Sequence, residues 1–263
     1  MNKTVPILIL LGLFGVATVY FFLQPVETVD ELPVPQLLPA EPIAAQQAEP
    51  VQDVLLPEES EVEAVVISEP LPVLYESDPE VSAAMAQIVG ADPLAQFLVK
   101  GEIISRMVAT IDALTSRQVP PQINPIRPVE GNFAAVNDGD RVTMSAENFR
   151  RYDAYIALLD AIDAVALLAF YDRYFPLFQQ AYEENGGEQD FDQRLREVID
   201  DLLDTPDVPG PIYVSKPEAV YLFEQDELES MSAGQKILVR MGSANAAVVK
   251  EKLLEIRQGL DGG

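Results

Sequence analysis

An uncharged, apolar run of 19 residues, Val5 to Leu23, restricts this chain more than any other feature. As a helix it would span roughly 28 Å, close to the hydrocarbon thickness of a bilayer. A cleaved signal peptide would have a shorter apolar region followed by a small-x-small site, whereas this run ends in Phe22-Leu23-Gln24-Pro25. A buried core helix is a third interpretation, which the acidic tract that follows disfavours. We therefore expect residues 5–23 to form an uncleaved transmembrane anchor.

The basic residues near this run predict its orientation. Lys3 precedes the run, and the next basic residue along the chain is Lys100. Cationic residues close to a membrane span stay on the cytoplasmic side. We therefore expect the N-terminus to be cytoplasmic and the rest of the chain to cross the membrane. In a bacterium with two membranes, this predicts an inner-membrane anchor and a periplasmic domain.

Residues 24–80 differ in composition from the rest of the chain. They hold ten prolines, fourteen Asp or Glu, and no Lys or Arg. Proline favours extended polyproline II, like charges repel, and such a chain buries too little apolar surface to offset its ordering entropy. We expect a disordered acidic linker. The apolar patch Val62–Ile67 interrupts it and is either a short recognition segment or a locally apolar part of the linker.

The overall charge and the missing residue types exclude several kinds of function. The formal net charge is -26, so the chain repels phosphate backbones and we expect no nucleic-acid partner. The chain has no His and no Cys, which excludes Ser-His-Asp and Cys-His catalysis and the usual zinc sites. No phosphate-binding Gly-rich loop or dinucleotide fingerprint is found, and Asn137–Asp140 does not have EF-hand spacing. We expect no cofactor and no metal.

Residues 81–263 show helical periodicity and predict an all-α domain of roughly seven helices with a minor β-hairpin. In the first half we expect a helix over 92–114 capped by Asp92, an extended segment over 120–128, and strands at 133–136 and 141–144 around a four-residue loop. A central apolar helix, or two helices, should follow over 150–182, kinked or broken at Pro176. The last elements are an amphipathic helix with its stripe at 195–202, helices opened by capping boxes at Ser215 and Ser232, and a helix after Gly242-Ser243.

Two long blocks of the domain resemble a known bacterial family. They are RYDAYIALLDAIDAVALLAFYDRYFPLFQQAYEENG, which begins at Arg151, and SAGQKILVRMG, which begins at Ser232. Shorter matching pieces are ATIDAL at 109–114 and PIRPV at 125–129. The chain resembles domain-of-unknown-function family 3014 over roughly residues 81–258, and its anchor and proline-rich spacer also look like that family. The resemblance implies this architecture and transfers no activity.

Three acidic residues of the expected central helix are candidates for chemistry. Asp153, Asp160 and Asp163 are spaced to fall near one face of that helix. Such carboxylates suit a general acid/base pair or a hard-cation site. Alternatively this face meets solvent, or the carboxylates pair with arginines such as Arg127 or Arg151.

The remaining candidates are binding residues. Arg127 lies on the rigid proline-rich segment, where it is suited to bind an anionic ligand or to form a structural ion pair. Gln179, Gln180 and Tyr182 give the central helix a polar end, which lines a binding cleft, for example for a glycan, or is simply solvated.

Taken together, these features predict an envelope protein that is not an enzyme. The long acidic spacer provides reach, so we expect a tethered helical domain that binds another protein or a cell-wall component. Two alternatives stay open. One is a glycan-cleaving enzyme that uses two carboxylates. The other is a subunit of a membrane complex whose anchor helix makes contacts of its own.

Overall fold

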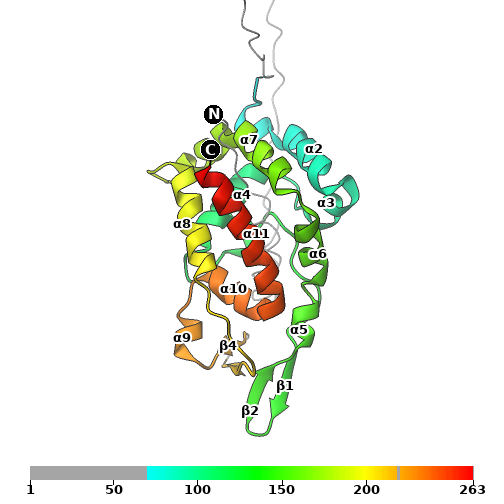
Figure 1. Cartoon of the computed structure of the whole chain (residues 1–263), viewed down its shortest axis with the longest axis vertical. Coiled ribbons are helices and arrows are strands. Elements are labelled where there is room, and N and C mark those ends of the chain that lie inside the picture. The colour runs from blue at the N-terminus through cyan, green and yellow to red at the C-terminus, as the bar shows by residue number, and fades with distance from the viewer. Residues whose placement is uncertain (1–69, 218–219, 263) are drawn as a thin grey trace, which may run out of the picture. The chain divides into compact units, whose positions relative to one another are not determined.

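The computed structural model describes residues 70–217 and 220–262. The expected anchor at 5–23 and the patch at 62–67 lie outside the described residues. In chain order the described elements (Figure 1) are η2 Leu74–Glu76, α2 Asp78–Val89, α3 Ala91–Phe97, α4 Ile103–Ala113, η3 Pro121–Ile123, β1 Ala135–Asp138, β2 Arg141–Met144, α5 Glu147–Arg150, α6 Asp153–Ala161, α7 Ala164–Glu184, α8 Phe191–Leu203, β3 Val214–Ser215, β4 Leu222–Phe223, α9 Asp226–Glu229, α10 Ala233–Met241 and α11 Ser243–Asp261.

The described part of the chain is mostly helical, which confirms the expected fold class. It contains ten α-helices rather than the roughly seven expected, because several expected helices are divided and α5 and α9 are single turns. It also contains two antiparallel strand pairs, β1–β2 and β3–β4, rather than one. The sequence therefore predicts the fold class correctly and the number of elements poorly.

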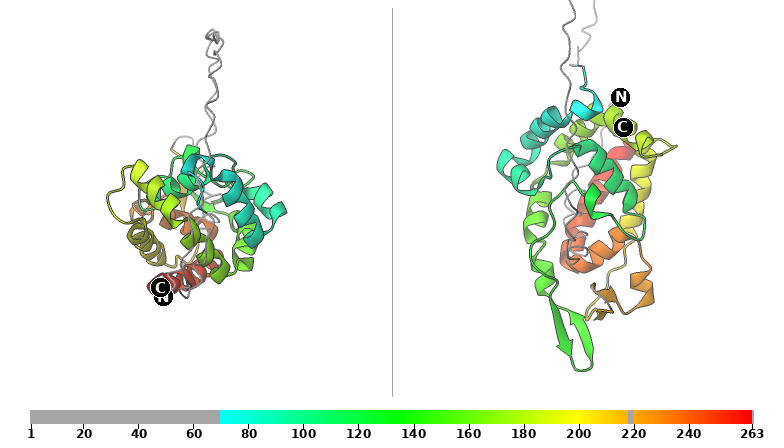
Figure 2. Two further views of the ribbon diagram at one scale, coloured as in Figure 1. Left: turned by 90° about the horizontal axis from the view of Figure 1, so that it is seen from above. Right: turned by 180° about the vertical axis from the view of Figure 1, so that it is seen from behind.

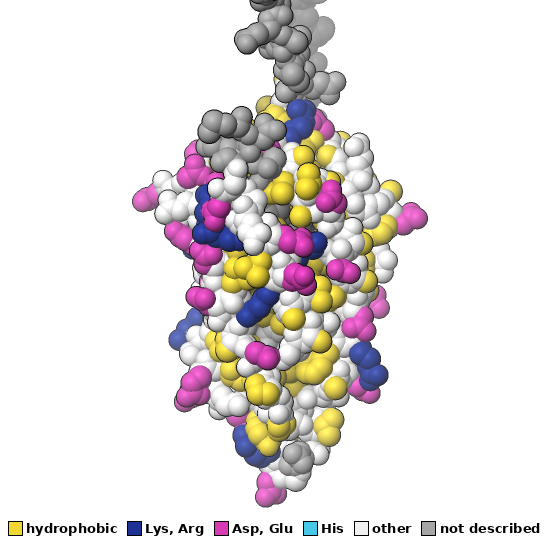
Figure 3. Space-filling view, viewed as in Figure 1, with side chains coloured by type: hydrophobic (Ala, Val, Ile, Leu, Met, Phe, Trp, Pro, Cys, Tyr) yellow, Lys and Arg dark blue, Asp and Glu magenta, His cyan; other side chains and the backbone are white. Residues whose placement is uncertain are grey.

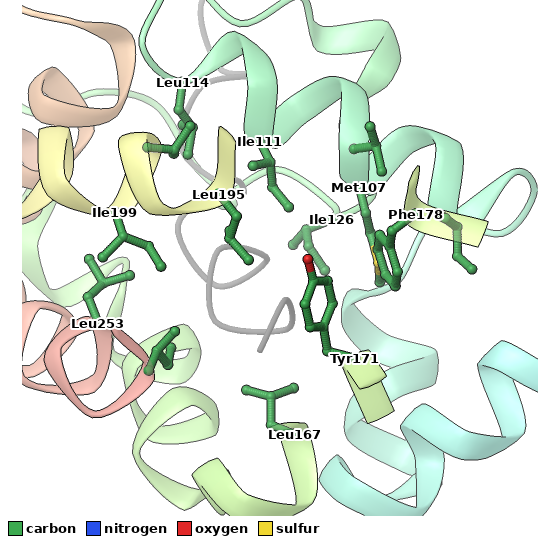
Figure 4. Close-up of a cluster of buried hydrophobic side chains, with 14 of the residues drawn as sticks. Met107, Ile111, Leu114, Ile126, Leu167, Tyr171, Phe178, Leu195, Ile199 and Leu253 are labelled. Carbon is green, nitrogen blue, oxygen red and sulfur yellow. The ribbon is translucent and has the colours of Figure 1, made fainter. Parts of the chain in front are cut away.

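The core lies between α4, α7, α8 and α11. Each helix turns an apolar stripe inward, and Met107, Tyr171, Leu195 and Leu253 are all at most 2% exposed. These side chains, which come from four different helices, gather in one cluster (Figure 4). The stripe of α8 is the one expected from the sequence, since Leu195, Val198, Ile199 and Leu202 are all buried. Burial of these stripes from water stabilises the packing of the helices.

The expected central helix is divided into two helices, α6 and α7, and its first residue, Arg150, belongs to the single turn α5. The break at Ile162–Asp163 turns α7 by 82° from α6. Asp163 caps the new helix, because its carboxylate accepts hydrogen bonds from the main-chain N–H groups of Val165 (3.3 Å) and Ala166 (3.2 Å). The expected break at Pro176 is wrong, since α7 continues through this residue to Glu184. Packing of α7 against α4 and α8 outweighs the one helical hydrogen bond that proline removes.

Within residues 70–217 and 220–262, no single helix has both the length and the apolarity that a membrane span requires. The bent pair α6 and α7 meets these two requirements together, by length and composition only.

The helix expected over residues 92–114 is also divided. It forms α3 and α4, which are separated by Leu98–Glu102, and Glu102 has a positive φ of 52°. Gly90 rather than Asp92 occupies the N-cap position of α3. The segment expected to be extended contains the single 3₁₀ turn η3 before Ile126 forms a β-bridge with Leu98.

The hairpin is present with a tighter turn than expected. Asp138 pairs with Arg141, so the turn has two residues, Gly139 and Asp140, and not four. Gly139 has φ +66°, a conformation that glycine adopts at little cost and that a two-residue hairpin turn favours. An isolated bridge connects Thr143 of β2 with Tyr213, the residue before β3.

The two expected capping boxes have different outcomes. The Ser232 N-cap is confirmed: its hydroxyl oxygen accepts from the main-chain N–H of Gln235 at 3.1 Å, at the start of α10. The side chain of Gln235 donates to the Asp201 carbonyl at 2.8 Å instead of completing a reciprocal box. Ser215 does not open a helix, because it belongs to β3 and pairs with Leu222 of β4.

The packed part of the chain begins before residue 81. Leu74 is buried, and the Asp78 carboxylate accepts from the N–H of Ile103 at 2.8 Å, which ties the start of α2 to the start of α4. Glu80 binds Arg173 and Tyr174 of α7 at 3.1 and 2.9 Å. Within the described domain, η2 and the end of α11 lie at one end and the β1–β2 hairpin at the other (Figure 2).

Candidate functional site

A cleft of about 510 Å³ lies between α5, the segment 208–212 and the corner that joins α10 to α11. Its apolar lining includes Met144, Phe149 and Met241, and its polar lining includes Arg150 and Asp153. Arg150 forms a loose ion pair with Glu147 at 3.8 Å and its side chain is 73% exposed. The cleft therefore combines apolar walls with charged groups of both signs.

A glycine corner forms one wall of this cleft. Gly242 has φ +84° and ψ 156°, a conformation almost exclusive to glycine, and it lets α11 start directly after α10. A Cβ atom at this position would lie 2.8 Å from the ring of Phe149, so the corner packs directly on that ring. The Asn245 amide donates to the carbonyls of Phe149 (3.0 Å) and Met241 (3.1 Å), which fixes α5 against the corner.

Hydrogen bonds hold the opposite wall. The N–H of Met144 donates to the carbonyl of Ile212 at 2.9 Å, so the segment that follows α8 runs beside β2. The Ser243 hydroxyl, in the first turn of α11, donates to the Asp207 carboxylate. These bonds connect all three sides of the cleft to regular elements, which makes it a preformed site.

A second cavity of about 210 Å³ adjoins the first. Val208 and Ser243 line both cavities, and Lys250 lines the second. The Lys250 ammonium donates to the carbonyl of Thr205. The two cavities therefore lie on either side of residue 208 along the first turns of α11.

The three acidic candidates do not share a face. Asp153 is exposed and lines the cleft, whereas Asp160 is exposed on α6 and Asp163 caps α7 after the 82° bend. Elsewhere Asp and Glu side chains are spread over the surface, as the face shown in Figure 3 illustrates. Within residues 70–217 and 220–262, no group of three or more carboxylates could hold a metal ion.

The arginine candidates lie at separate places. Arg151 donates to the carbonyls of Glu130 (3.1 Å) and Gly131 (2.7 Å) and so holds the loop that leads to β1. Arg127 is exposed, and its carbonyl accepts from the Tyr155 hydroxyl at 3.0 Å. Neither arginine lines the cleft.

The polar end of α7 forms the corner with α8. The Gln179 side-chain carbonyl accepts from the N–H of Phe191 at 2.7 Å, and Gln180 donates to Glu184 at 2.9 Å. The ring of Tyr182 packs 5.3 Å from that of Phe191, and burial raises the pKa of its hydroxyl. These three candidates therefore lie outside the cleft, and the structure gives them contacts within the fold.

Sequence reasoning missed most residues of the cleft. Phe149 lies far along the chain from Met241 and Asn245, and none of the three has a distinctive local pattern. Gly242-Ser243 was the one available signal, since it predicts a helix boundary. That signal indicates a corner and gives no indication of a cavity.

The fold and the cleft define a class: a mostly helical domain with a preformed cleft at the corner of its last two helices. A family model described as Protein of unknown function (DUF3014) matches residues 103–257. The chain therefore belongs to this family, as the resemblance predicts. Neither the curated proteins nor the solved structures contain a match to the chain.

Proposed function

We propose that this is a single-pass, membrane-anchored envelope protein whose helical domain binds a protein or cell-wall partner in the cleft beside Gly242. The observation that carries the proposal is the cleft itself. Its volume of about 510 Å³ falls in the range of binding pockets, which have apolar walls and a few polar groups that set orientation. The anchor at residues 5–23 and the acidic linker support a role at the far side of the membrane.

The chemistry of the lining favours an extended peptide or a similarly narrow chain as ligand. Met144 and Met241 are unbranched and adapt to different side chains, and the ring of Phe149 offers a flat apolar surface. Arg150 at the end of α5 and Asp153 at the start of α6 both line the cleft and can bind polar groups of the ligand. This combination suits binding of a chain with alternating apolar and polar groups.

The enzymatic alternative has less support. Hydrolysis of a glycan by two carboxylates requires an acid and a second carboxylate roughly 5–10 Å apart across the scissile bond. Asp153 is the one carboxylate among the described residues that line the cleft. The cleft therefore favours binding over this reaction.

Site-specific photo-crosslinking in the host bacterium tests the proposed site. The full-length protein would carry p-benzoylphenylalanine at Ala244, in the cleft lining, or at Ala157, an exposed residue of α6 outside it. We expect a defined crosslinked product from position 244 and none from position 157. Equal products at both positions, or none at either, would contradict the proposal.

A cavity-filling variant gives a second test. Ala244→Trp would occupy the cleft and should abolish the product formed by a crosslinker placed at Ser243, whereas Ala157→Trp should leave it unchanged. A C-terminal alkaline phosphatase fusion tests the topology separately, because this enzyme is active only outside the cytoplasm. Cytoplasmic location of the fusion would overturn the membrane part of the proposal.

A further inference from the structure

The β1–β2 hairpin leaves one strand edge open. β1 pairs with β2, and β3 pairs with β4. The bridge between Thr143 and Tyr213 places the two pairs side by side, and the four strands together are called the array below. Among the described residues, β1 has no strand on its other side. It lies at the end of the domain opposite to η2, and Figure 1 and the right view of Figure 2 show it clear of the helices.

The register identifies which main-chain groups face outward. The Ser145 N–H donates to the Ala134 carbonyl, so residue 134 faces β2, and alternate residues of an antiparallel strand point the same way. Val136 therefore also faces β2, and its carbonyl accepts from the Thr143 hydroxyl at 3.3 Å. It follows that the N–H and C=O groups of Ala135 and Asn137 point away from the hairpin.

The two edges of the array differ. At the β4 edge, the N–H of Phe223 donates to the Glu229 carboxylate at 2.9 Å, so α9 covers that edge. At the β1 edge, residues 133–137 (FAAVN) contain no Lys, no Pro and no charge, and Val136 is 52% exposed. The last residue of β1, Asp138, is acidic. Lysine, proline and bulges are the usual devices that keep a sheet edge from pairing with another strand. The β1 edge lacks the first two and pairs with β2 in unbroken register.

We infer that the β1 edge is a docking site for an extended, positively charged strand of a partner protein, which would add to the sheet beside β1. An added strand satisfies the outward groups of Ala135 and Asn137, as in β-strand addition. The site is separate from the cleft, because no residue of β1 lines it.

The acidic residues around β1 indicate the charge of the partner strand. Glu130 and Asp140 lie exposed on either side of β1, and neither forms an ion pair within the described part of the chain. The nearest cation of the hairpin, Arg141, is already engaged with Glu224 at 2.6 Å and with the ring of Tyr213 at 3.3 Å. A second copy of this chain would bring another net charge of -26 to the edge. A strand flanked by Lys or Arg is complementary to it.

The test uses the purified full-length protein in mild detergent and a defined probe. The probe is the dye-labelled peptide Lys-Lys-Val-Thr-Val-Thr-Lys-Lys. Its control is Lys-Lys-Pro-Pro-Pro-Pro-Lys-Lys, which has the same charge but no N–H donor in its four central residues. We expect the probe to bind and the control to bind at least tenfold more weakly. Equal binding of the two would show attraction by charge alone and would overturn strand addition.

Hydrogen exchange locates the binding. In the free protein the amides of Ala135 and Asn137 should exchange fast, and the probe should slow them specifically. Lack of protection at these two amides would overturn the proposal whatever the affinity. This measurement needs no variant, so it does not depend on the folding of a mutant.

Two matched variants complete the test. Val136→Lys adds a charge to the edge and should weaken probe binding at least tenfold, whereas Val165→Lys places the same charge on an exposed valine of α7 and should leave binding within twofold. Equal effects of the two variants would contradict the proposal. Dimers detected by sedimentation that Val136→Lys dissociates would assign the edge to a second copy instead.

Discussion

Gly242 is the residue on which the geometry of the cleft most depends. Its backbone lies in a region that other residues rarely adopt, and its missing side chain leaves room for the ring of Phe149. The same residue ends α10 and begins α11, so the corner, the ring contact and the position of Asn245 all depend on it.

Replacement of this glycine should therefore destabilise the domain. We expect Gly242→Ala to lower the free energy of unfolding by about 2–4 kcal/mol, from backbone strain and overlap with the Phe149 ring. Gly131→Ala is the control, because Gly131 has a similar φ of +83° and open space around it. It should cost only about 1 kcal/mol. Urea denaturation measures both, and equal losses would show that the ring contact contributes nothing.

A hydrogen bond between Tyr75 and Glu184 gives a prediction about pH. The Tyr75 hydroxyl donates to the Glu184 carboxylate, which holds the pKa of this carboxyl below its ordinary value. A depressed pKa stabilises the folded state above the ordinary carboxyl pKa, and that contribution is lost as the pH falls through the folded value. Tyr75→Phe should raise the pKa of Glu184, as measured by NMR titration of its carboxyl carbon. An unchanged pKa would mean that the bond is absent in solution.

Among the elements, the start of α7 has the clearest role for a candidate site residue. Asp163 was a candidate for chemistry, and the structure places it at the N-cap where the chain turns by 82°. Its neighbour Asp160 is exposed on α6. The two carboxylates, three residues apart, therefore make different contributions to stability.

We expect Asp163→Ala to cost about 1 kcal/mol of unfolding free energy, because two N–H groups of α7 lose their acceptor. Asp160→Ala should change it by less than about 0.5 kcal/mol. Thermal unfolding followed by circular dichroism at pH 7 compares the two. A larger loss for Asp160→Ala would contradict the capping role.

The elements also explain how far sequence reasoning reaches. The stripe of α8 and the Ser232 cap are local patterns, and both are confirmed. The position of the break before α7 was missed because the helical segments on either side of residues 162–163 are apolar on nearly every side, so no change of periodicity marks the break. Pro176 gave the stronger local signal for a break, yet tertiary packing keeps α7 continuous there. The cleft joins segments near 149, 210 and 242, and no local pattern encodes such a meeting.

At the scale of the whole molecule, the packed domain begins closer to the N-terminus than the sequence predicts. Leu74 packs in the core, Asp78 binds α4 and Glu80 binds α7. All three residues fall in the segment that was expected to be linker. The linker composition continues to residue 80, but the last ten residues of that segment are part of the fold.

This boundary can be tested with two fragments. A fragment of residues 71–263 should unfold roughly 6–12 °C higher than one of residues 81–263, because the shorter one loses the buried Leu74 and the bonds of Asp78 and Glu80. Differential scanning calorimetry compares them. Equal melting temperatures would show that residues 71–80 do not stabilise the fold and belong to the linker.

The position of the end of α11 has a practical consequence. Arg196 of α8 binds the Leu260 carbonyl at 2.9 Å, and this end of α11 lies on the same side of the domain as η2, opposite to the hairpin (Figure 1). A fluorescent tag or affinity handle joined after Asp261 would therefore project from the side where the chain enters the domain. Such a tagged protein keeps the strand edge unobstructed for imaging or capture experiments.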